Sequence, residues 1–210
     1  MAEACALAAG RPLHMAHVNT YCRGQTGSPV VEGERAIALL AEHPNIWSES
    51  YLAPINGLSA KCSDGAPESL AARNSLERGG FPATTDGMID AIRAGWAMIH
   101  LEADGVVRLV TGEEALAVWR ARAGDVGASF VSNPPEPRLR LVTATQPDGT
   151  FAIDALATDG GGIPRNDIVE RGLALVRLDA LDLRGFALKT SVVPARILGL
   201  ADKGHLGVGA

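Results

Sequence analysis

The sequence predicts an α/β fold built on a parallel sheet, either open and doubly wound or part of a barrel. Of the 210 residues, 47% are hydrophobic and 20% are charged, which is typical of a globular chain with a full core. Stretches with a helical period alternate with short strand-like runs along the chain. Glycine and proline, 24 and 12 residues, separate these runs by long polar loops, as in many α/β proteins.

Helical and strand-like patterns alternate through the first 121 residues. Two polar segments interrupt them, a glycine-bearing loop over 19–29 and a long loop over 53–67. In chain order the expected elements are a helix over 2–9, a strand over 12–18, a helix over 32–42, a strand over 45–52, helices over 68–78 and 85–97, strand-like residues on both sides of the turn 103–105, and a helix over 113–121.

The remaining residues predict a hairpin or strand-turn unit and then mainly helices. Pro147, Asp148 and Gly149 form a strong turn signal between two apolar arms. The expected elements are a strand over 126–131, a proline-rich connector over 133–137, arms over 139–145 and 150–156, and helices over 167–175, 181–190 and 194–200. In parallel α/β folds the functional groups lie at the carboxyl ends of the strands, so the site is expected at those ends.

Charge and hydropathy exclude several classes of protein. The formal charge is −5, without a basic face for nucleic acid. The longest apolar runs fall far short of the roughly 18 residues that a membrane span requires, and the first residues lack the basic region of a signal peptide. We therefore expect a cytoplasmic protein without membrane or nucleic-acid partners. Cys5, Cys22 and Cys62 are irregularly spaced, which favours reduced thiols.

A histidine pair marks the end of the first predicted strand. Residues i and i+3 on a strand point to opposite faces, so at most one of His14 and His17 is expected on the working side. His17 is nearer the carboxyl end and is the better candidate, because neutral imidazole is a common ligand of zinc and related metals. The alternative is a core or loop histidine that bonds a backbone carbonyl.

The second candidate, Asp159, ends an apolar strand and opens the triple-glycine loop 160–162. A carboxylate there could bind a metal and act as a base toward a metal-bound water. An ordinary Asp-Gly turn, or a loop whose amides cradle a phosphate, are the alternatives. Arg165 and Asn166 could recognise a carboxylate or amide group of a ligand, although Asn166 could equally be a helix N-cap.

Several other polar residues are weaker candidates. Glu49, on a strand beside Tyr51, could line a site. The alternative is a structural role, either solvated or hydrogen-bonded. The same holds for the loop residues Asn56, Lys61 and Cys62. The remaining histidines have no partner spacing and are expected at the surface: His43, His100 and His205.

Residues 190–210, TSVVPARILGLADKGHLGVGA, strongly resemble the end of the barrel in the metal-dependent amidohydrolase superfamily. In that family a helix with the pattern N-P-A-x-x-L-G-L leads into K-G-x-I-x-x-G-A-D-A-D, and Val193 stands here where Asn is usual. Residues 157–159 resemble the family's strand 8, and residues 13–19 resemble a strand that carries a metal-binding histidine. Residues 49–52 match the next strand of the hydantoinase, dihydroorotase and D-aminoacylase branch more loosely.

The resemblance implies the C-terminal portion of a (β/α)8 TIM-type barrel that hydrolyses cyclic amides or N-acyl amides with one or two divalent cations, Zn²⁺ in the first instance. It implies that His17 and Asp159 are metal ligands and that Asp159 is the base for the attacking water. A homo-oligomer is expected for the full-length form. The expected contacts of the small-molecule amide substrate are Asn19, Gly160, Gly161, Arg165 and Asn166.

Two departures from the family pattern concern the ends of the chain. The family's His-x-His strand and its bridging Lys, Cys or Glu ligand do not occur before His14, and the sequence stops at Gly209 and Ala210, where Asp-Ala-Asp is usual. We therefore expect one partial barrel domain over 1–210, truncated at both ends. With two ligands instead of the three that a catalytic zinc requires, it should be inactive alone. A non-catalytic barrel-half scaffold and a module that binds phosphorylated metabolites are the alternatives.

Overall fold

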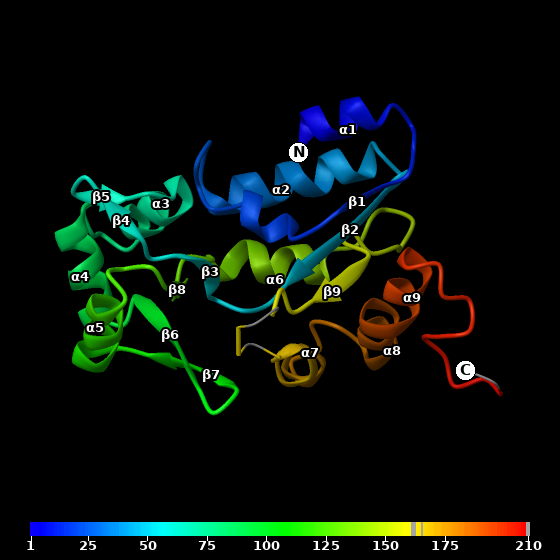
Figure 1. The fold of residues 1–210 in the computed structure, drawn as a ribbon. Helices are drawn as coiled ribbons and strands as arrows, with labels where there is room; N and C mark the ends of the chain where they lie inside the picture. Colours follow the sequence, from blue (N-terminus) through cyan, green and yellow to red (C-terminus); the bar gives the residue numbers. More distant parts are fainter. Residues whose placement is uncertain (161–162, 165, 209–210) are drawn as a thin grey trace. The chain divides into compact units, whose positions relative to one another are not determined.

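A computed structural model describes residues 1–160, 163–164 and 166–208, and it confirms a mixed α/β protein (Figure 1). Its residues form two compact units. The first comprises Met1–Ala53, Pro134–Asp159 and Asn166–Ala210, and the second comprises Pro54–Asn133 and Gly160–Arg165. Strands within the described residues do not close into a barrel. No helix in this part of the chain combines the length and apolarity that crossing a membrane requires.

The first unit contains the parallel sheet that the sequence predicts. Its three strands are β1 (Leu13–Met15), β2 (Ile46–Tyr51) and β9 (Ala155–Ala157), in the order β1-β2-β9. Both pairings are parallel, with Leu13 opposite Ile46 and Glu49 opposite Ala155. Because β2 is central, the carboxyl ends of β1 and β9 lie on either side of it, with Met15 opposite Ser48 and Ala157 opposite Tyr51.

Helices of the first unit begin and end where local chemistry allows. Helix α2 (Pro29–Ala41) starts three residues before the expected position, because the Ser28 hydroxyl accepts a hydrogen bond from Val31 N and proline is favoured at the first helical position. Residues 183–197 form two short helices that are joined, without a break, by a π-helical turn. The others are α1 (Ala2–Ala8), the 3-10 turn η1 (Val18–Tyr21), α6 (Pro135–Thr143), α7 (Ile168–Arg177), α8 (Leu183–Ala187), the π turn η2 (Leu188–Val192) and α9 (Val193–Ile197).

The two faces of β2 have different surroundings. Ile46, Ser48 and Ser50 are buried, whereas Trp47 on the opposite face is 39% exposed. Alternation in a strand explains this difference, since successive side chains point to opposite faces. Two separate apolar clusters fill the unit, one including Met15, Leu40, Ile46, Leu141 and Ile153, and one made of Leu52, Val142, Leu156, Leu175 and Leu181.

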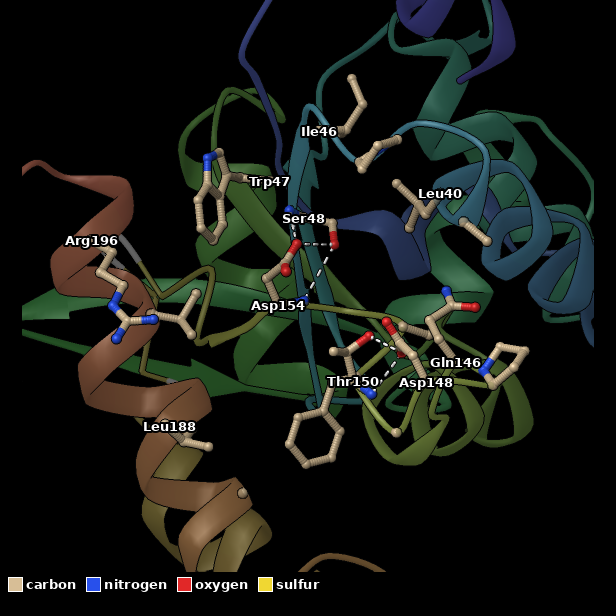
Figure 2. A pocket seen from close by; sticks show the side chains of 18 of the residues that line it. Leu40, Ile46, Trp47, Ser48, Gln146, Asp148, Thr150, Asp154, Leu188 and Arg196 are labelled. Atoms are coloured by element: carbon tan, nitrogen blue, oxygen red, sulfur yellow. Dashed lines mark hydrogen bonds between the residues drawn. The ribbon is translucent and has the colours of Figure 1, made fainter.

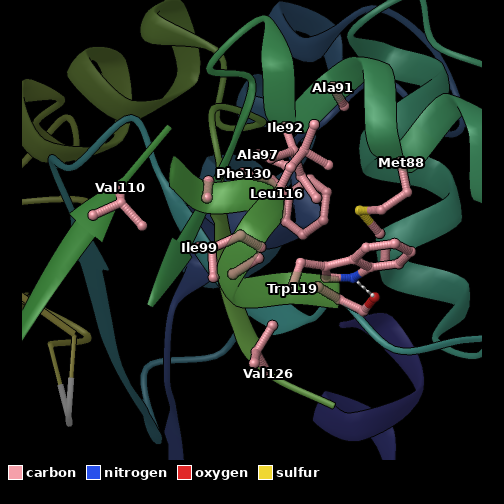
Figure 3. Packing of buried hydrophobic residues seen from close by; sticks show 14 of the residues in the cluster. Met88, Ala91, Ile92, Ala97, Ile99, Val110, Leu116, Trp119, Val126 and Phe130 are labelled. Atoms are coloured by element: carbon pink, nitrogen blue, oxygen red, sulfur yellow. Dashed lines mark hydrogen bonds between the residues drawn. The ribbon is translucent and has the colours of Figure 1, made fainter. Parts of the chain in front are cut away.

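The second unit is built on an antiparallel sheet, which the prediction of a parallel sheet missed. The strand order is β3-β8-β6-β7, and every pairing in it is antiparallel. A single apolar cluster lies against this sheet; Leu116 and Phe130 are fully buried in it, and Trp119 Nε1 donates to Ala60 O at 2.9 Å (Figure 3). The elements are β3 (Asn56–Ser59), β4 (Cys62–Ser63), β5 (Ala66–Pro67), α3 (Leu70–Arg78), α4 (Thr85–Arg93), β6 (Ala97–Ala103), β7 (Val106–Val110), α5 (Gly112–Ala121) and β8 (Gly127–Phe130).

Three local predictions were wrong. The long loop over 53–67 contains the strands β3, β4 and β5. The proline-rich connector and the following arm form helix α6, because Pro135 and Pro137 lie in its first turn, where the missing N–H groups have no intrahelical partner to lose. Of the expected hairpin only an isolated antiparallel bridge between Thr145 and Phe151 is present.

Candidate active site

His17 and Asp159, the two strongest candidates from the sequence, lie side by side in the first unit. His17 follows β1, Asp159 follows β9, and His17 Nε2 lies 3.4 Å from Asp159 Oδ1. Both residues have left-handed backbone angles, with φ of 55° and 49°, so the chain turns sharply where each strand ends. Thr20 stabilises the turn at His17 by donating its amide N–H and its hydroxyl to His17 O, at 2.9 and 2.8 Å.

Glu49 on the central strand links these residues to His14. Its Oε1 lies 3.2 Å from His17 Nε2, and its Oε2 lies 3.5 Å from His14 Nε2. The Glu49 side chain is 17% exposed, so these contacts are partly shielded from water. Tyr51, further along the same strand, meets the His17 ring edge-on with centroids 5.7 Å apart. We call His14, His17, Glu49 and Asp159 the His17 cluster.

The two histidines do not separate onto opposite faces as alternation predicts. Strand β1 ends at Met15, and the left-handed angle at His17 redirects the chain before alternation could place its ring on the far side. Both imidazoles therefore reach Glu49. Sequence analysis underrated Glu49, although a single carboxylate near the carboxyl end of the otherwise uncharged strand β2 was a usable signal.

Asn19, expected to contact substrate, is 1% exposed and fastens β2 to the turn after His17. Its Oδ1 accepts hydrogen bonds from Ser50 Oγ at 3.1 Å and from Tyr51 N at 3.2 Å. Its Nδ2 is buried and has no hydrogen-bond partner among the described residues. A substrate contact through this amide stays a prediction.

The loop that leads from His17 to α2 is fixed by Glu32, which is 6% exposed. Its carboxylate accepts hydrogen bonds from Gly24 N and Thr26 N, each at 2.5 Å, and from Thr26 Oγ1 at 3.0 Å. Burial by itself raises the pKa of Glu32, but the amide hydrogen bonds from residues 24–26 outweigh burial and lower this pKa. The ionised carboxylate thus determines the shape of this loop.

Other predicted site residues lie elsewhere. Gly160 belongs to the second unit, where its carbonyl accepts from Ile163 N at 2.7 Å, whereas Gly161 and Arg165 lie outside the described residues. Asn166 is exposed and does not cap α7, whose N-cap is Asp167. The phosphate-cradle alternative involves Gly162 too, which is also outside the described part.

The weaker candidates Asn56, Lys61 and Cys62 all lie in the second unit. Lys61 Nζ forms an ion pair with Glu68 Oε1 at 3.7 Å, and burial raises the pKa of the Cys62 thiol. Of the histidines expected at the surface, His205 is exposed, His43 is half-buried, and His100 is half-buried with its Nε2 2.9 Å from Ser129 Oγ.

The His17 cluster has the donor types that zinc and related cations prefer, an imidazole nitrogen and carboxylate oxygens. Two ligands of a tetrahedral ion lie about 3.3 Å apart when each metal bond is about 2.0 Å. The 3.2 and 3.4 Å contacts of His17 Nε2 have this spacing, and ion pairs have it as well. No group of three or more His, Cys, Asp or Glu side chains in the described ranges is already arranged to hold a metal ion. The donor chemistry therefore fits a cation, while the present arrangement is one of direct ion pairs.

Comparison with family models, with curated proteins and with solved structures finds no match to this chain.

Proposed function

We propose that this chain is the C-terminal portion of a (β/α)8 barrel and belongs to a metal-dependent hydrolase of carbon–nitrogen bonds in cyclic or N-acyl amides. One observation carries the proposal. The two residues that the sequence resemblance implies as metal ligands, His17 and Asp159, follow the carboxyl ends of two strands of one parallel sheet and lie 3.4 Å apart. This is the edge at which parallel α/β enzymes bind and transform their substrates.

The open face of the sheet supports the barrel part of the proposal. Parallel sheets are normally covered on both faces. The His14 side chain lies on the face of the sheet that carries Glu49 and is 41% exposed. Further strands and side chains of a barrel would cover this face around His14.

Each residue of the His17 cluster has a proposed role. His17, Asp159 and Glu49 would hold the divalent cation, which gives the three protein ligands that a catalytic zinc requires. When bound, the cation supplies Lewis acidity and lowers the pKa of water. Asp159 accepts the proton of the attacking water and returns it to the leaving nitrogen. Asn19, Gly160, Gly161, Arg165 and Asn166 are the proposed contacts of a small-molecule amide.

Metal titration tests the proposal. We expect the metal-free chain to bind one Zn²⁺ in a calorimetric titration, and Asp159→Asn or His17→Gln to weaken binding by at least about tenfold, the scale on which lost ligation acts. His205→Gln and Asp179→Asn, which remove an exposed histidine and an exposed aspartate outside the His17 cluster, are matched controls. A chain that binds none of Zn²⁺, Mn²⁺ and Co²⁺, or variants that bind as the wild type does, would refute the metal site.

Hydrolysis tests the reaction class. In a version of the chain extended at both ends, Asp159→Asn is expected to abolish cleavage of a panel of N-acyl amino acids and cyclic amides, because the proton acceptor is lost. Unchanged hydrolysis by that variant would contradict the role of Asp159.

A further inference from the structure

A hollow in the first unit lies at the opposite end of the strands from the His17 cluster. Its volume is about 960 Å³, and it reaches the first residues of β2, Ile46 to Ser48, together with the turn over 146–151 (Figure 2). All of its lining residues belong to the first unit. It is large enough for a small organic molecule, since ligand pockets commonly measure about 300–1,000 Å³.

The walls of this hollow combine apolar, aromatic and charged side chains. The helical segment over 183–197 forms one side through Leu188 and Val193, with an arginine near each end, Arg184 and Arg196. Trp47 on β2 and Phe151 in the turn provide ring surfaces, and Figure 2 shows the Trp47 ring and the Arg196 guanidinium bordering the same space. An apolar body with one charged end would match such walls.

The carboxylates of the hollow already have hydrogen-bond donors. Asp154 Oδ2 accepts from Ser48 N at 2.8 Å and from Ser48 Oγ at 2.9 Å. Asp148 Oδ1 accepts from the amide and hydroxyl of Thr150. Asp182 Oδ1 accepts from Gly185 N at 2.6 Å as the N-cap of α8. These acids act in local turns and caps and stay negatively charged, so an anion in the hollow would have to be held at the arginines.

The cations of the hollow are less well partnered. Residues 183–197 carry Arg184, Lys189 and Arg196 and no acidic residue. Among the described residues none of these three side chains forms an ion pair with a carboxylate, and neither arginine side chain makes a hydrogen bond. Lys189 lies behind the wall, fully buried; its Nζ donates to Ile153 O and lies 4.1 Å from the centre of the Phe151 ring. Burial lowers the pKa of Lys189 to about 7, although the negative charge of Asp154 acts in the opposite direction.

We propose that this hollow binds an organic carboxylate with an aromatic body, whose carboxylate pairs with Arg196 or Arg184 and whose rings pack on Trp47 and Phe151. Guanidinium groups pair with carboxylates through two parallel hydrogen bonds, and aromatic walls favour flat apolar groups. This site is separate from the His17 cluster and does not depend on the proposed hydrolase function.

Three probes with the same aromatic body and the same linker length test the inference by calorimetric titration of the intact chain: 4-biphenylacetate, 2-(4-biphenyl)ethanol and 2-(4-biphenyl)ethylamine. We expect the acid to bind at least about tenfold more tightly than the alcohol or the amine. Arg196→Gln, Arg184→Gln or the double variant should weaken the acid by about fivefold or more, because the charged partner is lost. Arg177→Gln, an exposed arginine of the same unit outside the hollow, is the control and should bind as the wild type does.

Two further variants locate the bound probe. Trp47→Ala should weaken the acid and the alcohol alike, because both use the ring surface, whereas His17→Gln should leave binding unchanged. If Trp47→Ala does not fold, the arginine variants decide, since both side chains are exposed and their loss leaves the core intact. No binding of the acid at millimolar concentration, equal or tighter binding of the amine, or an unaffected double arginine variant would overturn the inference.

Discussion

The two compact units differ in what they bury. Both bury neutral polar side chains, but the buried carboxylate and the buried amine of the described chain, Glu32 and Lys189, both lie in the first unit. The second unit has one continuous apolar cluster, whereas the first divides its apolar residues between two. Burying a charged group costs free energy unless hydrogen bonds compensate it. We therefore expect the buried Glu32 and Lys189 to lower the stability of the first unit while they fix the positions of the groups around them.

Both candidate sites lie in the unit that buries charge. Glu32 holds the loop that follows His17, and Lys189 lies behind the wall of the hollow lined by Trp47 and Arg196. The second unit instead has fully buried apolar side chains on α4, α5 and β8 around Trp119. We infer that its buried residues serve mainly stability, while those of the first unit also position side chains. Three measurements test this difference between the two units.

The largest effect is expected at Lys189, as a pH dependence of stability confined to the first unit. Its pKa is about 7 in the folded chain against an ordinary value of 10.5. Between these values the unfolded state binds more protons at Lys189, so this group should raise the free energy of unfolding from pH 7 to pH 10.5 and leave it unaffected below pH 7. The buried Cys22 thiol, whose pKa burial raises from 9.0 to about 12, acts in the opposite direction above pH 9, so the rise should be clearest between pH 7 and pH 9. At about 1.4 kcal/mol per unit of pKa the total is at most about 5 kcal/mol.

Urea unfolding followed by Trp47 fluorescence in a Trp96→Phe, Trp119→Phe background measures this effect, because Trp47 is then the remaining tryptophan and lies in the first unit. Lys189→Met should stabilise the first unit at pH 7 and remove the rise with pH. Lys203→Met, at a side chain that is 54% exposed, should change neither. An equal pH dependence in Lys189→Met and wild type would show that the buried amine of Lys189 does not make the stability of the first unit depend on pH.

The next effect compares the same substitution in the two units. Leu116→Ala should cost about 4 kcal/mol, because Leu116 is fully buried inside the single large cluster and its surroundings cannot collapse easily. Leu181→Ala should cost about 2 kcal/mol, because its cluster is small and the residue is 5% exposed. Unfolding is followed by Trp96 and Trp119 for the second unit and by Trp47 for the first. Equal costs would show that the two cores are packed alike.

The pair His17 and Asp159 could be predicted from the sequence because their proximity follows from few assumptions. Polar residues after apolar strands meet at one edge if the strands are parallel, and His17 and Asp159 do so. Glu49 and His14 were ranked lower for physical reasons. Alternation predicts the direction of a side chain only inside a strand, and β1 ends two residues before His17.

The antiparallel unit could not be recognised from local patterns. Alternation and turn residues predict strands, but they do not say which strand pairs with which or in which direction. Strand β8 pairs with β3 and β6, which come from distant parts of the sequence. Helix α6 was missed because its prolines suggested a connector, although proline is favoured in a first helical turn.

The smallest effect is expected at Glu32, and it tests whether buried charge fixes the loop beside the His17 cluster. In Glu32→Gln an amide nitrogen replaces one acceptor oxygen, so at least one of the backbone donors Gly24 N and Thr26 N loses its partner. We expect a loss of about 1–3 kcal/mol and faster hydrogen exchange at both amides. Glu34→Gln, on the same helix, removes an exposed ion pair with Arg140 and should cost about 1 kcal/mol or less.

The sign with pH follows from the lowered pKa of Glu32. The stabilising contribution is present above the ordinary pKa of 4.5 and is lost as the pH falls through the lower folded value. Wild type should therefore lose protection at Gly24 and Thr26 in acid, while Glu32→Gln should show no such change. If Glu34→Gln loosened the loop as much as Glu32→Gln, the buried carboxylate would not be what holds it, and the first unit would owe its geometry to packing as the second does.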